Sequence, residues 1–289
     1  MNRLSDTKLN ILVTGGAGFI GSGLVQKLLN EGHFVTSIDN YFTGSKENHV
    51  NGCKYLNKTT SDCWTINKKN IDIIYHLGEY SRVEQSFDDI DLVFKYNWNS
   101  IYSVLSLARD TNAKLIYAGS STKYADEGNN YKESPYAYTK YINADLVNTF
   151  CKWNNMNYAI TYFYNVYGKK EISQGDYATV VGKFLHAKKN GIKTVNVTKP
   201  GTQKRNFTHI DDIVEGLFLV GLEGNGDGYG IGSDTSYSII ELANLFGLKI
   251  KYVPERKGNR MNAPVINHKI KELGWIEKNS LKTYINKYT

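Results

Sequence analysis

The chain has 289 residues, of which 41% are hydrophobic and 22% are charged, a mixture typical of a folded globular protein rather than a disordered or fibrous one. Its formal net charge of +7 would attract anions, but the lysines are scattered, so we expect no nucleic-acid partner. The three cysteines lack the spacing of a zinc site or a disulfide framework, and we expect no metal. No run approaches the roughly 18 apolar residues that span a bilayer, which predicts a cytoplasmic protein without a membrane partner.

Apolar runs alternate with helical patterns along the first half of the chain. Residues 10–14 are a short apolar run that predicts a strand, and glycines separate it from a helical pattern that begins near Leu24. Strands alternating with helices indicate an α/β fold with a Rossmann-type, doubly wound parallel sheet. The further predicted strands are residues 34–38, 71–77, 114–118 and 158–163, and the predicted helices between them are 93–108 and 138–153.

Beyond residue 165 the loops become longer and richer in glycine and asparagine. Helices are predicted there at residues 179–189, 213–222, 238–246 and 267–273. We therefore predict two domains. Residues 1–165 form the sheet domain, and residues 166–289 form a smaller, mainly substrate-binding lobe with some segments returning to the sheet.

A glycine-rich segment, TGGAGFIGS over residues 14–22, directly follows the first predicted strand. Glycines at positions 15, 18 and 21 permit a tight turn that brings backbone N–H groups and a helix N-terminus to a pyrophosphate. Asp39 ends the next predicted strand, where a carboxylate can accept hydrogen bonds from ribose hydroxyls and would repel a 2′-phosphate. The pattern predicts NAD as the cofactor of residues 1–165. The alternatives are a plain glycine turn and a capping role for Asp39.

A second pattern, Tyr136 followed four positions later by Lys140, opens a predicted helix. A lysine one helical turn from a tyrosine lies on the same face, and its charge can make a phenolate available as a base. Ser120, at the end of a predicted strand, could hydrogen-bond the same substrate oxygen. The alternative is a solvated helix face, which a chain rich in tyrosine and lysine produces by chance.

Together, these motifs resemble the extended short-chain dehydrogenase/reductases, specifically the NAD-dependent nucleotide-sugar epimerases and dehydratases of the UDP-glucose 4-epimerase type. The resemblance covers residues 8–275, nearly the whole chain. Its motifs occur in the family's order: TGGAGFIGS (14–22), IDNYFTGSKEN (38–48), YHLGEYSRVEQS (75–86), GSSTKY (119–124), SPYAYTK (134–140), FYNVYG (163–168), RNFTHIDDIVEG (205–216) and KELGW (271–275).

The resemblance also implies roles for individual residues. It implies that Ser120, Tyr136 and Lys140 are catalytic. The implied cofactor-binding residues, besides Tyr136 and Lys140, are Gly15, Gly18, Phe19, Ile20, Gly21, Asp39, Asn40, Asp62 and Leu77. The implied substrate-binding residues are Ser120, Asn165, Arg205 and Arg256.

Within the family, dehydratases and decarboxylases carry an acidic residue where this chain has Thr122, which favours an epimerase that acts at C4 of a UDP-hexose or UDP-N-acetylhexosamine. The resemblance places the position that limits pocket size in the 4-epimerases at Asn262 or Ala263, and small residues there imply room for an N-acetylated sugar. Glu79 and Glu84 occupy positions where the family usually has small or different polar residues. The alternatives are an NDP-4-keto-sugar reductase, a heptose epimerase and a non-catalytic NAD(H)-binding regulator. The resemblance further implies a homodimer that pairs the helices predicted at 93–108 and 138–153.

Overall fold

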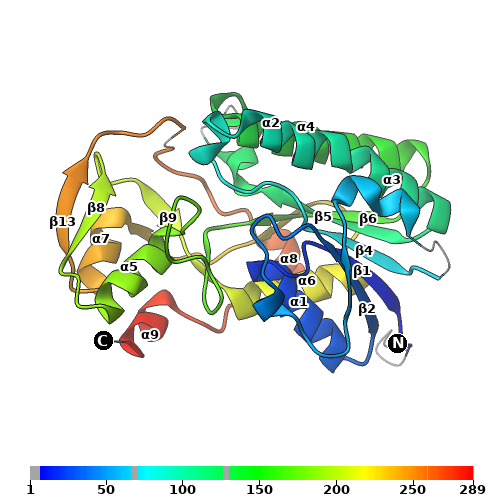
Figure 1. The fold of residues 1–289 in the computed structure, drawn as a ribbon, viewed down its shortest axis with the longest axis horizontal. Coiled ribbons are helices and arrows are strands. Elements are labelled where there is room, and N and C mark those ends of the chain that lie inside the picture. Colours follow the sequence, from blue (N-terminus) through cyan, green and yellow to red (C-terminus); the bar gives the residue numbers. More distant parts are fainter. Residues whose placement is uncertain (1–6, 67–69, 126–129, 259, 289) are drawn as a thin grey trace.

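A seven-stranded sheet forms the centre of the computed structural model, which describes residues 7–66, 70–125, 130–258 and 260–288 (Figure 1). Every neighbouring pair of strands in this sheet is parallel, in the order β11-β6-β5-β4-β1-β2-β3. The predicted α/β class and doubly wound parallel sheet are therefore confirmed. The strands are β1 (Asn10–Thr14), β2 (Phe34–Asp39), β3 (Lys54–Asn57), β4 (Ile73–His76), β5 (Lys114–Ser120), β6 (Tyr158–Phe163) and β11 (Gly226–Ile231).

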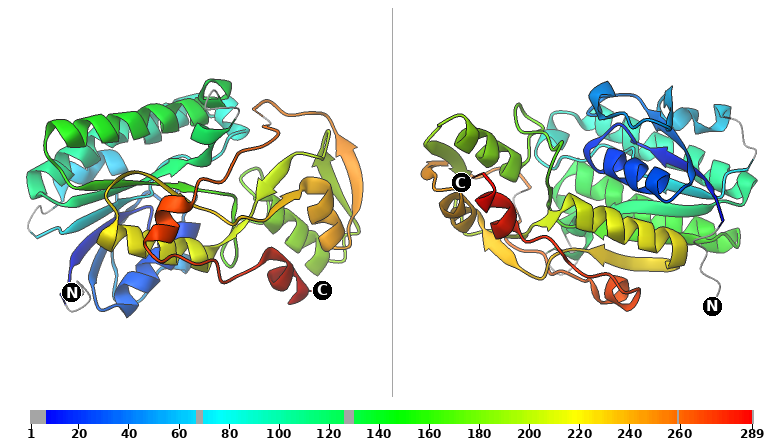
Figure 2. Two further views of the ribbon diagram at one scale, coloured as in Figure 1. Left: turned by 180° about the vertical axis from the view of Figure 1, so that it is seen from behind. Right: turned by 90° about the horizontal axis from the view of Figure 1, so that it is seen from below.

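Helices cover both faces of this sheet (Figures 1 and 2). Successive side chains of a strand point to opposite faces, so Leu12 of β1 joins one apolar core and its neighbours Ile11 and Val13 join the other. The first core contains residues of α3 and α4, and the second contains residues of α1 and α6. The bounds of these helices are α1 (Phe19–Asn30), α3 (Asn99–Thr111), α4 (Pro135–Trp153) and α6 (Ile210–Glu223).

A smaller lobe lies beside the sheet and has its own apolar core, which includes Phe184, Leu242 and Phe246 (Figure 1, left). Its strands β8 and β13 pair in parallel. The chain beyond residue 165 also returns to the large sheet, through α6 and β11. The remaining elements are α2 (Ile90–Val93), β7 (Val166–Tyr167), α5 (Val180–Lys189), β8 (Thr194–Thr198), β9 (Lys204–Asn206), β10 (Thr208–His209), β12 (Ser236–Ser238), α7 (Ile239–Leu245), β13 (Lys249–Val253), α8 (His268–Glu272) and α9 (Leu281–Asn286).

Several elements differ from the prediction. In the large sheet β3 and β11 were not predicted, since β3 has no fully buried residue and β11 reads GDGYGI. The helix predicted at residues 93–108 is divided into α2, a π-helical segment over residues 94–98, and α3, and α6 begins at Ile210, three residues before its predicted start. Helix α4 begins at Pro135, also three residues early. The Ser134 hydroxyl accepts a hydrogen bond from the Ala137 N–H, and proline suits the first position of a helix.

Several large apolar side chains are exposed on the two helices for which a dimer contact is predicted. Tyr102 of α3 is 60% exposed, and Tyr138 and Trp153 of α4 are 44% and 73% exposed. The homodimer itself stays a prediction, as does the cytoplasmic location. Among the described residues, no helix is both long and apolar enough to cross a membrane.

Candidate active site

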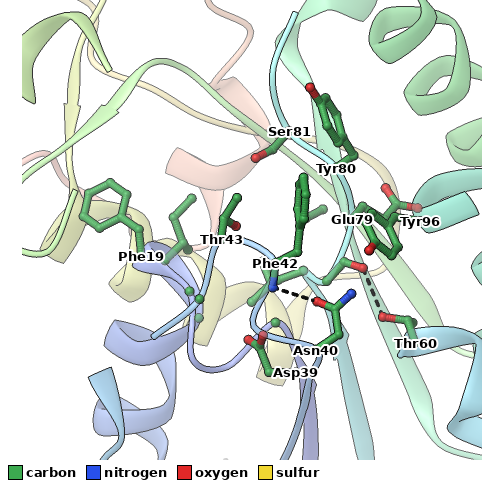
Figure 3. Close-up of a pocket in the computed structure, with 18 of the residues that line it drawn as sticks. Phe19, Asp39, Asn40, Phe42, Thr43, Thr60, Glu79, Tyr80, Ser81 and Tyr96 are labelled. Atoms are coloured by element: carbon green, nitrogen blue, oxygen red, sulfur yellow. Dashed lines mark hydrogen bonds between the residues drawn. The ribbon is translucent and has the colours of Figure 1, made fainter. Parts of the chain in front are cut away.

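A large pocket opens at the carboxyl ends of β1, β2, β4 and β5, where ligands bind in open parallel α/β sheets (Figure 3). It is lined by the glycine turn before α1, by the segment after β2 and by the loop after β4. Tyr136 and Lys140 of α4 complete its wall. The pocket thus gathers the two patterns that the sequence predicted to act together.

The glycine turn is shaped for close approach of a ligand to the backbone. Gly15, Gly18, Phe19, Ile20 and Gly21 all line the large pocket. A Cβ atom at Gly21 would lie 2.0 Å from the Gly15 carbonyl oxygen, and Gly15 itself has a positive φ of 75°. The first N–H groups of α1 therefore open onto the pocket. This cradle fits the pyrophosphate of a dinucleotide.

Asp39 closes β2 at the edge of the pocket. One carboxylate oxygen accepts a hydrogen bond from the Ala17 N–H at 2.9 Å, and the other accepts one from the Tyr41 N–H at 2.8 Å. Burial raises the pKa of Asp39, and these two N–H donors counteract that rise. Asn40 also lines the pocket, and its side-chain oxygen accepts a hydrogen bond from the Phe42 N–H (Figure 3). Asp39 and Asn40 thus line the same pocket as the glycine turn, and their contacts with adenosine stay a prediction.

The other two predicted cofactor contacts differ in their placement. Leu77 lines the large pocket, and its N–H donates to the Thr14 hydroxyl. Asp62 does not line it, because its carboxylate accepts hydrogen bonds from the Thr59 N–H and hydroxyl at the start of a short 3-10 helix. The pocket wall there consists of Thr60 and Ser61. A direct adenine contact by Asp62 stays a prediction that this geometry does not favour.

Lys140 belongs to a buried network at the base of the pocket. Its ammonium group lies 2.5 Å from a Glu79 carboxylate oxygen and 2.5 Å from the Ala118 carbonyl oxygen. Tyr117 and Asn143 also donate to Glu79. Burial alone would raise the pKa of the Glu79 carboxyl, but the Lys140 charge and the adjacent His76 lower it to about 2. The lysine is therefore half of a buried ion pair rather than an isolated cation.

Ser120 ends β5 and is buried. It lines neither the large pocket nor the second hollow, which is described in the next paragraph. Its hydroxyl oxygen accepts hydrogen bonds from the Thr122 hydroxyl at 3.0 Å and from the Thr122 N–H at 3.3 Å. The backbone beside it, Ala118 and Gly119, does line the large pocket. A catalytic role for Ser120 stays a prediction that requires its hydroxyl to reach the substrate from this buried position.

A second hollow brings together three of the four predicted substrate-binding residues, Asn165, Arg205 and Arg256, but not Ser120. We call it the arginine hollow. Asn165 has a positive φ of 34°, and its amide donates to the Asn206 carbonyl oxygen. Arg256 forms an ion pair with Glu84. The hollow is also lined by Val83, Glu84, Thr122, Lys257, Gly258 and Arg260.

Three residues of these sites, Glu79, Arg82 and Arg260, have no role predicted from the sequence. Glu79 was noted as a departure from the family pattern, but its pairing with Lys140 was not predicted. Arg82 lines the large pocket and Arg260 lines the arginine hollow, where it donates to the Ser121 hydroxyl at 3.2 Å. The sequence signal was present for Arg82, which lies within the segment YHLGEYSRVEQS. Among the described residues, no group of three or more His, Cys, Asp or Glu side chains could hold a metal ion.

The chain is similar to known proteins in both sequence and fold. A model of the NAD dependent epimerase/dehydratase family matches residues 11–232. UDP-glucuronic acid decarboxylase 3 of Arabidopsis thaliana is 30% identical, over 97% of this chain and 88% of its own. A putative UDP-glucose 4-epimerase of Methanocaldococcus jannaschii is 26% identical, over 96% of each chain. The crystal structure of a Thermotoga maritima UDP-glucose 4-epimerase with UDP-glucose superposes with a TM-score of 0.89, at 26% identity and 97% coverage of each chain.

These relatives act on nucleotide sugars by more than one reaction, so they show the family and not the reaction. The family match spans most of the chain and includes the glycine turn, Asp39, Tyr136 and Lys140. The family's cofactor is NAD, and the cradle of Gly15 and Gly21 beside the Asp39 carboxylate fits it. The chain therefore belongs to the NAD-dependent epimerase/dehydratase family.

Proposed function

We propose that the chain is an NAD-dependent nucleotide-sugar epimerase that inverts C4 of a UDP-hexose or UDP-N-acetylhexosamine through a 4-keto intermediate. The observation that carries this proposal is the hydroxyl pair formed by Ser120 and Thr122 at the end of β5, which puts a threonine where the family's dehydratases have an acid. Elimination and decarboxylation need a further acid or base at the sugar, which the family's dehydratases place at position 122. A buried threonine hydroxyl cannot fill that role.

The carboxylates that line the two pockets do not replace the missing acid. Asp39 accepts two backbone N–H groups at the end of β2. Glu79 is paired with Lys140, and Glu84 with Arg256. The large pocket and the arginine hollow have no other acidic residue among the residues that line them. A reaction that needs only oxidation and reduction at one carbon suits this set of side chains best.

In the proposed reaction Tyr136 takes the proton of the 4-hydroxyl group and later returns it. Bound NAD supplies the acceptor and donor of the hydride at C4. Lys140 lies one turn along α4 from Tyr136, is paired with the buried Glu79 carboxylate, and lines the same pocket as Tyr136. Ser120 supports the sugar oxygen.

The arginine hollow is the proposed diphosphate site. A nucleotide diphosphate carries two negative charges, and arginine side chains bind such oxygens with charge-assisted hydrogen bonds. Arg205, Arg256 and Arg260 line this one hollow together with the Asn165 amide. Firm contacts at the diphosphate leave the sugar free to present either face of C4 to the cofactor.

Decarboxylation of a UDP-uronic acid is the second candidate, because a decarboxylase is among the relatives with 30% identity. The two reactions are separated by their products. The purified protein, without added cofactor, is incubated with UDP-glucose, UDP-N-acetylglucosamine and UDP-glucuronic acid, and the sugar protons are followed by NMR. We expect galacto epimers with all sugar carbons retained, whereas a pentose product would refute the epimerase proposal.

The role of Tyr136 is tested with a matched pair of variants on the same helix. Tyr136→Phe should lower turnover by at least about a hundredfold, because general acid–base catalysis typically contributes that much. Tyr138 is 44% exposed on α4 and lines neither pocket, so Tyr138→Phe serves as the control. Turnover by Tyr136→Phe within a few-fold of the unmodified enzyme would show that another group moves the proton.

A further inference from the structure

Arg82 places a positive charge in the wall of the large pocket that the proposed reaction does not use. Its Nε donates to the Tyr177 carbonyl oxygen at 2.7 Å, and its Nη1 donates to the Ser81 carbonyl oxygen and hydroxyl at 3.0 and 3.1 Å. All of these acceptors are neutral. Among the described residues, no carboxylate lies within ion-pair distance of Arg82 and none accepts from its Nη2.

The electrostatic surroundings of Arg82 contrast with those of the other cation in this wall. Lys140 is paired with the buried Glu79 carboxylate. Arg82 instead forms no ion pair with a carboxylate. Burial lowers its pKa, although Tyr136, Tyr80, Tyr177 and Glu171 favour its charged form. Burial also raises the pKa of Glu171 to about 7, so that carboxyl is a weak countercharge near neutrality. Of the cations that line the large pocket, Arg82 is the one that would gain most from an anionic ligand.

The position of Arg82 indicates which part of a ligand it meets. The loop over residues 79–84 begins in the large pocket and ends in the arginine hollow, because Arg82 lines the first and Val83 and Glu84 line the second. A nucleotide sugar with its diphosphate in the hollow and its reacting carbon at Tyr136 crosses this junction. The group that passes Arg82 is then the sugar. The cofactor diphosphate would lie instead at the glycine turn, where Gly15 and Gly21 leave room for it.

We propose that Arg82 binds a carboxylate on the sugar, so that the substrate class is a nucleotide-activated uronic acid. This inference rests on the proposed function and narrows its substrate. A planar guanidinium with a free Nη2 matches the two oxygens of a carboxylate, and a hydroxymethyl group at the same place would leave the charge uncompensated. The ion pair with Arg82 would be lost if carbon dioxide left the sugar, so this contact stabilises the intact carboxylate and suits epimerisation at C4.

Calorimetric titration of the NAD-loaded protein with UDP, UDP-glucose and UDP-glucuronic acid tests the inference. We expect UDP-glucuronic acid to bind at least tenfold more tightly than UDP-glucose, and Arg82→Met to abolish that preference while leaving UDP affinity within twofold. Arg82→Gln is the second variant, since it retains hydrogen-bond donors without the charge. Arg109 is an exposed arginine paired with its neighbour Asp110, so Arg109→Met is the control.

Three outcomes would overturn the inference. Equal affinity for the two sugars in the unmodified protein refutes the uronic acid and leaves the epimerase proposal standing. An Arg82→Met variant that loses affinity for ADP-ribose, measured on cofactor-free protein, while keeping the sugar preference assigns the arginine to the cofactor diphosphate. Failure of UDP and both UDP-sugars to bind refutes the proposed function, and this inference with it.

Discussion

Removing the Glu79 carboxylate should destabilise the whole chain, because it leaves the Lys140 ammonium buried without a countercharge. The two side chains are only 1% and 7% exposed, so water cannot replace the lost partner. Breaking a buried ion pair by removing one member typically costs about 3–5 kcal/mol. Tyr117 and Asn143 would lose their acceptor as well, which favours the upper part of that range. We therefore expect Glu79→Ala to lose about 4 kcal/mol of unfolding free energy.

Urea unfolding followed by circular dichroism measures this loss. Glu272 is an exposed glutamate on α8 without an ion pair, so Glu272→Ala is the matched control and should change stability by less than about 0.5 kcal/mol. The double variant Glu79→Ala, Lys140→Met removes both charges and should recover part of the loss. A loss below about 1 kcal/mol in Glu79→Ala would refute the claim that the pair is buried and tightly coupled.

The same carboxylate gives stability a defined dependence on pH. Its pKa is about 2 in the folded chain against a reference value of 4.5, so the folded state holds the charged form more strongly. A carboxyl whose pKa falls on folding contributes stability above the reference pKa, and this contribution is lost as the pH falls from about 4.5 toward 2. The full effect is about 3 kcal/mol. Glu79→Gln should flatten this acid limb, and an unchanged limb would show that other groups produce it.

Three further predictions concern single side chains. Burial raises the pKa of Glu171 to about 7. The stability that this group contributes at low pH is therefore lost as the pH rises through 7. Between pH 5 and 8 the Glu171→Gln variant should lose less thermal stability than the unmodified chain. Asp39→Ala should weaken NADH binding at least tenfold in a fluorescence titration, since it removes the ribose acceptor. A Cβ at Gly221 would lie 1.7 Å from the Tyr75 hydroxyl oxygen, so Gly221→Ala should cost about 1–3 kcal/mol in urea unfolding.

The parts of the fold that the sequence predicted are those in which local patterns and burial agree. Strands β1, β2, β4, β5 and β6 are short apolar runs beside glycine or polar turns, and each is buried by helices on both faces. In the edge strands β3 and β11 the local sequence does not have a buried apolar pattern. These strands form because β3 pairs with β2 and β11 pairs with β6, so they depend on contacts with distant residues rather than on their own composition.

In the candidate site, too, local motifs could be predicted from the sequence and contacts between distant residues could not. The glycine turn and the Tyr136 to Lys140 spacing are local motifs, and residues of both line the large pocket. Arg205 and Arg256 lie far apart in the chain, and both line the arginine hollow. The roles assigned to these residues stay predictions. The partner of Lys140 could not be predicted, because Glu79 lies 61 positions away and the contact depends on the register of β4 beside β5.

This pairing changes what the lysine of the Tyr136 motif can contribute. An ammonium group has three N–H donors, and two of those of Lys140 are used by Glu79 and the Ala118 carbonyl oxygen. One N–H donor of Lys140 remains for a ligand hydroxyl. The Glu79 carboxylate also cancels much of the Lys140 charge, which was predicted to lower the pKa of the tyrosine. Arg82 also lines the large pocket, at its junction with the arginine hollow, and its positive charge has no carboxylate partner among the described residues. Lys140 is therefore best understood as a positioning group, and the electrostatic attraction for an acidic ligand comes from an arginine outside the motif.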